Sequence, residues 1–126
     1  MLDYCRMSLI IPEEAAYTKE NVQASIINCL LEKCLAQLIW LSKGLSVERT
    51  ALKEMGIHMD RRVVDQVECL LTTLSEKHPG LQVAIQGHYL YYPERSPQIP
   101  WWDDHGGFFE GKIENGKVYI EDTPIV

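Results

Sequence analysis

The chain has 126 residues and a formal net charge of −6 at pH 7, and that length fits one domain able to bury a core without disulfides or metal. Hydrophobic residues make up 46% and charged residues 24%, which excludes a wholly disordered, collagen-like or coiled-coil chain. Residues 81–126 contain seven acidic against three basic side chains. We therefore expect no large basic surface of the kind that marks most nucleic-acid-binding proteins.

The first residues lack the features of a secretory signal, because Asp3 and Arg6 interrupt residues 1–11 and no apolar run is followed by small residues. The most apolar stretch, residues 26–41, contains two charged side chains and is too short to cross a bilayer. These features predict a soluble cytoplasmic protein.

The four cysteines are expected to be reduced thiols. Cys29 and Cys34 are five residues apart, so on one helix they point about 140° away from each other. The spacing of the four is not that of the paired doublets in structural zinc sites. Cys5, near an expected disordered start, is not a credible nucleophile, and no metal or cofactor is predicted.

A first helix is predicted from Thr18, which caps it, to about Lys43, before Gly44. Its apolar residues spread over more than half of the circumference, where a surface helix would need one apolar stripe. The helix is therefore either central to the fold or shared with another chain as a dimer seam. Trp40 and Leu41 are the candidate contact residues for such a seam.

A short second helix over residues 47–55 is predicted from the cap Ser46 and the terminating Gly56. Asp60 then caps a third helix, which residues 78–80, His-Pro-Gly, bring to an end. Apolar residues recur in this third helix at intervals of three and four: Val63, Val64, Val67, Leu70, Leu71 and Leu74.

Two β-hairpins are predicted after the helices. Residues 81–86 and 89–92 are rich in strand formers and flank a two-residue turn, Gly87-His88. A second hairpin joins residues 108–113 to 117–121 through the strong turn signal Asn-Gly. The predicted fold class is α+β, with three N-terminal helices followed by antiparallel hairpins. Residues 1–92 would form the body, and residues 93–126 a loop and C-terminal hairpin appendage packed on the same domain.

In residues 38–57 the predicted helices are connected by Gly44-Leu45-Ser46 and Gly56-Ile57. The valine-leucine ladder of the third helix and the glycine-containing first hairpin then follow. Over about residues 24–92 this pattern resembles a winged helix-turn-helix domain. In particular it resembles the winged-helix subunits that accompany kleisins in bacterial condensin complexes.

The resemblance implies a way of binding DNA in which the first residues of the third helix enter the major groove. The side chains in these roles would be Arg61 and Arg62 at guanine or phosphate, Arg49 and Lys53 at the backbone, and His88 at the wing tip near the minor groove.

The third helix also has features that oppose DNA binding. Asp65 and Glu68 continue its outward face and would repel a phosphate array. Arg61 and Asp65 are four residues apart, so they could instead pair on a solvated surface.

Paired tryptophans, Trp101 and Trp102, stand in a polar loop before Asp103, Asp104 and His105. Tryptophans are unfavourable when fully wet, so they either cover the core or anchor a partner. An acid-base or metal cluster is the weaker hypothesis, because adjacent aspartates point in different directions and no ligand spacing is characteristic.

Together these features predict a non-catalytic regulatory or adaptor protein of winged-helix type, with a protein partner favoured over DNA and self-association through the first helix. One alternative is a DNA-binding transcriptional regulator. Another is an acidic inhibitor or immunity-type protein that neutralises a toxin or host factor through the segment that includes Asp103 and Asp104. No membrane contact and no small-molecule substrate are predicted.

Overall fold

The structure is a computed structural model that describes residues 4–42, 46–48, 59–90 and 106–124. In chain order its elements are β1 (Tyr4–Ile10), α1 (Lys19–Glu32), the 3-10 helix η1 (Ala36–Ser42), β2 (Ser46–Glu48), α3 (Arg62–Lys77), β3 (Gln82–Leu90), β4 (Gly106–Glu114) and β5 (Lys117–Pro124). The predicted α+β class is confirmed. The predicted order, with the helices before every strand, is not observed, because β1 precedes α1.

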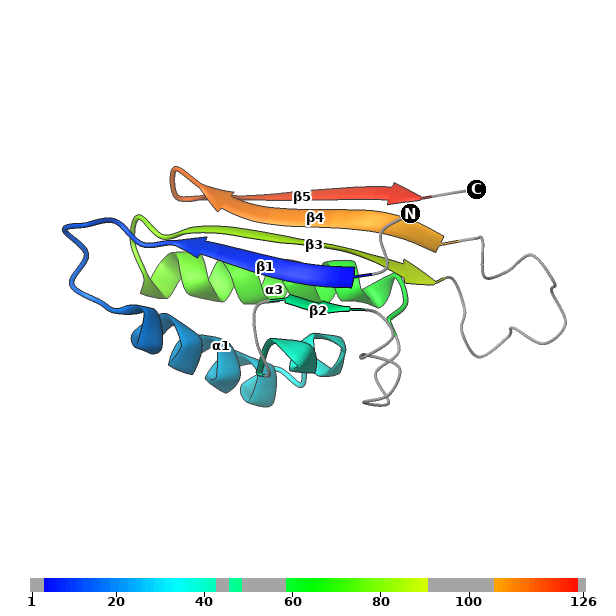
Figure 1. The fold of residues 1–126 in the computed structure, drawn as a ribbon, viewed down its shortest axis with the longest axis horizontal. Coiled ribbons are helices and arrows are strands. Elements are labelled where there is room, and N and C mark those ends of the chain that lie inside the picture. Colours follow the sequence, from blue (N-terminus) through cyan, green and yellow to red (C-terminus); the bar gives the residue numbers. More distant parts are fainter. Residues whose placement is uncertain (1–3, 43–45, 49–58, 91–105, 125–126) are drawn as a thin grey trace, which may run out of the picture.

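The strands form one antiparallel sheet in the order β2-β1-β3-β4-β5. The helices α1, η1 and α3 all lie on one face of it, so the fold has two layers (Figure 1). β1 was not predicted. Its Cys5 and Met7 point into the core, so Cys5 is a buried side chain of a strand that was not predicted from the sequence.

The first helix is interrupted where the sequence predicted a continuous one. Thr18 does cap it, through a reciprocal capping box with Asn21. The helix ends at Glu32. Cys34, two residues later, has a φ of 55°, and the backbone N–H of Leu35 donates to the carbonyl of Leu30 (3.0 Å). This is the Schellman arrangement, with cysteine in the position that glycine usually takes. The break lets α1 and η1 present different apolar faces to one core, which explains the wide apolar spread of residues 18–43.

The first residues of the predicted second helix are not helical. Ser46, expected to be its cap, lies instead in β2, where Arg6 is its partner in β1 and Cys5 is opposite Val47. Pairing with a distant strand overrides the local capping signal. The remainder of the predicted helix, with Gly56, lies outside the described residues.

The third helix is confirmed as α3. Asp60 was predicted to cap this helix, but the N-cap position is Arg61, which makes no side-chain capping hydrogen bond. Asp60 lies one residue earlier, and its carboxylate accepts a hydrogen bond from the backbone N–H of Arg62 (2.9 Å). Along α3 the apolar ladder is buried against the sheet. Gly111 of β4 makes this contact close, because a Cβ there would lie 2.5 Å from Cγ1 of Val67 and 2.9 Å from Cδ1 of Leu71.

The first predicted hairpin was wrong. β3 runs without a turn through Gly87 and His88, which pair with Phe109 and Phe108 of β4. Gly87 is needed for space, because a Cβ there would lie 2.5 Å from Sγ of Cys5 and 3.0 Å from Cζ of Phe109. The glycine that suggested a turn instead lets core side chains pack against the strand.

The second predicted hairpin is confirmed. β4 and β5 are joined by Asn115 and Gly116, both with positive φ (53° and 77°), as a tight primed turn requires. β4 also pairs with β3 over eight residue positions. The hairpin is therefore part of the central sheet, whereas the sequence predicted an appendage on the body.

The core lies between the sheet and the helices. Its largest fully buried side chains are Trp40, Tyr89, Leu38, Leu70, Leu71, Leu74, Leu81 and Ile85. Within the described part of the chain, no helix has both the length and the apolar character needed to span a membrane.

Candidate functional site

The two faces of the sheet differ in character because side chains alternate along each strand. Residues such as Met7, Ile85 and Phe109 point to the helices and are buried. No element of the described chain covers the other side of the sheet, which we call the open face (Figure 1). The residues at alternate positions on this face are Arg6, Ser8 and Ile10 of β1, Ala84, Gln86 and His88 of β3, Phe108, Glu110, Lys112 and Glu114 of β4, and Lys117, Tyr119, Glu121 and Thr123 of β5.

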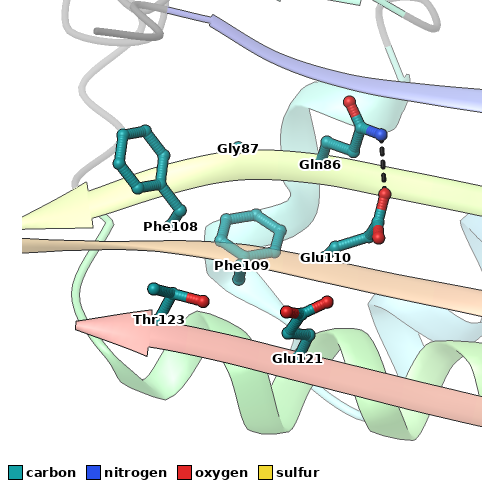
Figure 2. Close-up of a pocket in the computed structure, with 7 residues that line it drawn as sticks. All are labelled: Gln86, Gly87, Phe108, Phe109, Glu110, Glu121 and Thr123. Atoms are coloured by element: carbon teal, nitrogen blue, oxygen red, sulfur yellow. Dashed lines mark hydrogen bonds between the residues drawn. The ribbon is translucent and has the colours of Figure 1, made fainter.

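A row of polar side chains crosses the open face from β1 to β5. The register places Arg6 opposite Gln86, Gln86 opposite Glu110, and Glu110 opposite Glu121. Arg6 donates to Oε1 of Gln86 from Nε (3.3 Å) and Nη2 (3.1 Å). The Gln86 amide in turn donates to Oε2 of Glu110 (2.7 Å), as Figure 2 shows. The hydrogen bonds orient Glu110 toward β3.

Beside this row the open face has a shallow hollow of about 240 Å³. The side chains of Phe108, Glu110, Glu121 and Thr123 surround it on two adjacent strands (Figure 2). Glu110 and Glu121 are directly opposite each other, and like charges at opposite positions destabilise a strand pair. Among the described residues neither carboxylate has a basic ion-pair partner.

These groups are suited to binding a cation by hydrogen bonds. Two carboxylates offer acceptors for a guanidinium or ammonium group, and the ring of Phe108 offers an apolar wall beside them. The described residues contain no group of three or more His, Cys, Asp or Glu side chains that could hold a metal ion. The neighbouring carboxylate Glu114 differs, because Lys112 already pairs with it (3.5 Å).

The predicted DNA-contacting arginines of the third helix are both in ion pairs. Nε of Arg61 donates to Asp122 of β5 (3.0 Å), and Arg62 pairs with Asp60 through its Nε and Nη2. Hydrogen bonds from Arg62 hold the pKa of Asp60 at about 2, below the usual 3.8. Arg61 was expected to reach DNA or to pair with Asp65, and its ion-pair partner is Asp122. The two other predicted DNA contacts, Arg49 and Lys53, lie outside the described residues.

His88 does not lie at the tip of a wing. It is inside β3, only 5% exposed, with its ring centroid 6.0 Å from that of Phe108. The prediction placed it in a turn, and because β3 continues through it, that position was wrong.

The predicted protein-interaction residues of the first helix are in the core. Trp40 is fully buried and Leu41 nearly so, both within η1, which corrects their assignment to a dimer seam. The exposed apolar side chains near them are Ile27 and Leu31 of α1 and Ile39 of η1. The other predicted contact residues, Trp101, Trp102, Asp103 and Asp104, lie outside the described part of the chain.

The polar row as a unit was not predicted from the sequence. Arg6 was not assigned to a strand, and the predicted turn at Gly87 separated Gln86 from its place in the sheet. One local signal was available. Over residues 82–86 the large apolar side chains Val83 and Ile85 alternate with glutamine or the small Ala84, which is typical of a strand with one buried face.

Comparison of the chain with known protein families, with curated proteins and with solved structures gave no match.

Proposed function

We propose that this protein is a non-catalytic binding module that recognises another protein through the open face of its sheet. The observation that carries the proposal is the hollow, where Glu110 and Glu121 lie side by side without a basic partner among the described residues. A lysine or arginine of the partner would relieve their repulsion and gain charge-assisted hydrogen bonds. The adjacent Phe108 and Tyr119 would add apolar contact area, which aromatic side chains provide at many interfaces.

The distribution of charge supports recognition at one place. Across the open face, three basic side chains (Arg6, Lys112 and Lys117) balance three acidic ones. The face as a whole therefore has no strong net field, and preference for a basic side chain would arise locally at the hollow. This is compatible with a regulatory, adaptor or inhibitor-type protein.

DNA binding is the weaker alternative. Arg61 and Arg62 are each held by a carboxylate, and those contacts would have to be given up before either arginine could bind phosphate. The winged-helix relationship remains a prediction of the sequence, as does a cytoplasmic location. The proposed binding through the open face does not depend on either one.

A peptide of six arginines is a suitable probe of the hollow. We expect NMR titration of the labelled protein to shift the backbone signals of Phe108, Glu110 and Glu121. Glu110→Gln should weaken this binding roughly fivefold, about 1 kcal/mol for a partly exposed ion pair. Glu114→Gln removes the same charge from the same face and strand, so it is the matched control and should bind nearly as the wild type.

Shifts spread evenly over the acidic surface, or equal weakening by Glu110→Gln and Glu114→Gln, would contradict the proposed site. An electrophoretic shift assay at low salt tests the alternative. Retardation of duplex DNA that is abolished by Arg61→Ala or Arg62→Ala would favour the DNA-binding function.

A further inference from the structure

β5 is the last strand of the sheet. β4 pairs with one side of it along its length, and the described residues place no strand on the other side (Figure 1). An open strand edge is a template for pairing with another chain, and many proteins block such edges with charges or proline. The charges on β5 therefore decide which chain can pair there.

The turn shows which backbone groups face outward. Glu114 and Lys117 close a two-residue turn, so they form a hydrogen-bonded pair, and such pairs alternate along an antiparallel ladder. The backbone groups of Lys117, Tyr119 and Glu121 consequently point toward β4. Those of Val118 and Ile120 point to the open edge, free to bond to another strand.

We propose that β5 pairs antiparallel with β5 of a second copy of this chain, with Tyr119 on the two-fold axis. In this register Val118 is opposite Ile120 of the second copy and exchanges backbone hydrogen bonds with it. On the open face, Lys117 is opposite Glu121 of the second copy, and this pair occurs twice by symmetry. Tyr119, which is 46% exposed and has Lys112 Nζ 5.8 Å from its ring centroid, lies opposite its own copy.

Neighbouring registers are worse matched. Centring the pairing on Ile120 places Val118 opposite Asp122, a carboxylate that Arg61 and Tyr89 already engage. Centring it on Glu121 places two glutamates directly opposite each other, which is unfavourable. Charge and side-chain type thus select the register centred on Tyr119, and a second copy is the occupant that supplies the matching sequence.

The association is concentration-dependent and weak, because a single strand pair buries few side chains. The pairing would join the two open faces into one continuous surface with two hollows, and in each hollow Glu121 would have Lys117 of the second copy beside it while Glu110 would keep no basic partner among the described residues. It does not require the proposed binding function, and the two are tested separately.

Light scattering after size exclusion, over a concentration series, tests the pairing. The wild-type mass should rise from 14.5 kDa toward twice that value. Lys117→Glu and Glu121→Lys should each remain at the monomer mass, and the double variant should dimerise again because the pair is restored with reversed sign. Lys19→Glu makes the same charge change on α1 and should behave as the wild type. A wild type that stays monomeric throughout, or a double variant that does not regain the dimer, would overturn the proposal.

Cysteine cross-linking tests the register. In a Cys34→Ser background, which removes an exposed native thiol, Tyr119→Cys places two thiols at a close non-hydrogen-bonded pair on the axis. Oxidation should give a covalent dimer. Thr123→Cys, also exposed on the open face of β5, should give none. A dimer linked equally well through position 123 would overturn the register, and a wild-type dimer that resists both cysteines would place the interface elsewhere.

Discussion

His78 is a titratable side chain that is buried in the described core. Its Nε2 lies 2.8 Å from Oγ of Ser25, its ring contacts Tyr17 edge-on, and Nδ1 has no hydrogen-bond partner among the described residues. Burial, aided by the charge of Lys77, lowers the pKa of this imidazole below 6.5. The folded protein therefore binds a proton at this site less readily than the unfolded chain does.

The contribution of His78 to the free energy of unfolding should consequently be fully present above about pH 6.5. It should fall as the pH drops below that value toward the lowered pKa. Urea denaturation between pH 7.5 and 5 measures this dependence. His78→Gln keeps a hydrogen-bonding group near Ser25 without the titration, so its slope over this range should be shallower. An unchanged slope would contradict the assignment. Asp60, with a pKa of about 2, contributes only in a separate and more acidic range.

Gly87 offers a second test at the residue scale. Alanine at this position would place Cβ 2.5 Å from Sγ of Cys5, and overpacking of this kind costs about 1–3 kcal/mol. Chemical denaturation should show a loss of that size for Gly87→Ala. Adding Cys5→Ala removes the nearest atom, so the double variant should be more stable than the sum of the two single losses predicts. Strict additivity would argue against the close contact.

At the scale of elements, the break between α1 and η1 depends on a cysteine in a left-handed conformation. The left-handed conformation costs an L-residue with a side chain roughly 1–2 kcal/mol, whereas glycine adopts it without this cost. Cys34→Gly should therefore raise the free energy of unfolding by up to about 1 kcal/mol. Lys33→Gly, one position earlier and with a negative φ, should lower it or leave it unchanged. A destabilised Cys34→Gly variant in thermal or urea unfolding would show that the thiol itself matters.

Some elements of this fold could be predicted from the sequence, and others could not. α3 and the β4-β5 hairpin were predicted because each is specified locally, by an apolar ladder and by an Asn-Gly turn. β1 and the continuity of β3 were not. Gly87 is read as a turn residue unless it is known that Cys5, far away in the sequence, needs its space. Local signals cannot report such long-range packing.

For the molecule as a whole, the same reason explains what was missed at the candidate site. The hollow and the polar row exist only once four strands are aligned in register, with Arg6, Gln86, Glu110 and Glu121 on one line. An acidic C-terminal surface was one of the hypotheses drawn from the sequence, and both glutamates belong to that segment. Their adjacency follows from the register and from the turn that sets it.

β1 lies between β2 and β3 in the sheet, so it is synthesised before both of the strands with which it pairs. Residues 6–10 leave the ribosome long before residues 82–86, their neighbours in the finished sheet. Until those residues emerge, one side of β1 is an unsatisfied edge in a nascent chain. Folding dominated by such distant pairing is slow and prone to aggregation. We therefore expect newly made chains to depend on chaperones that shield the N-terminal strand.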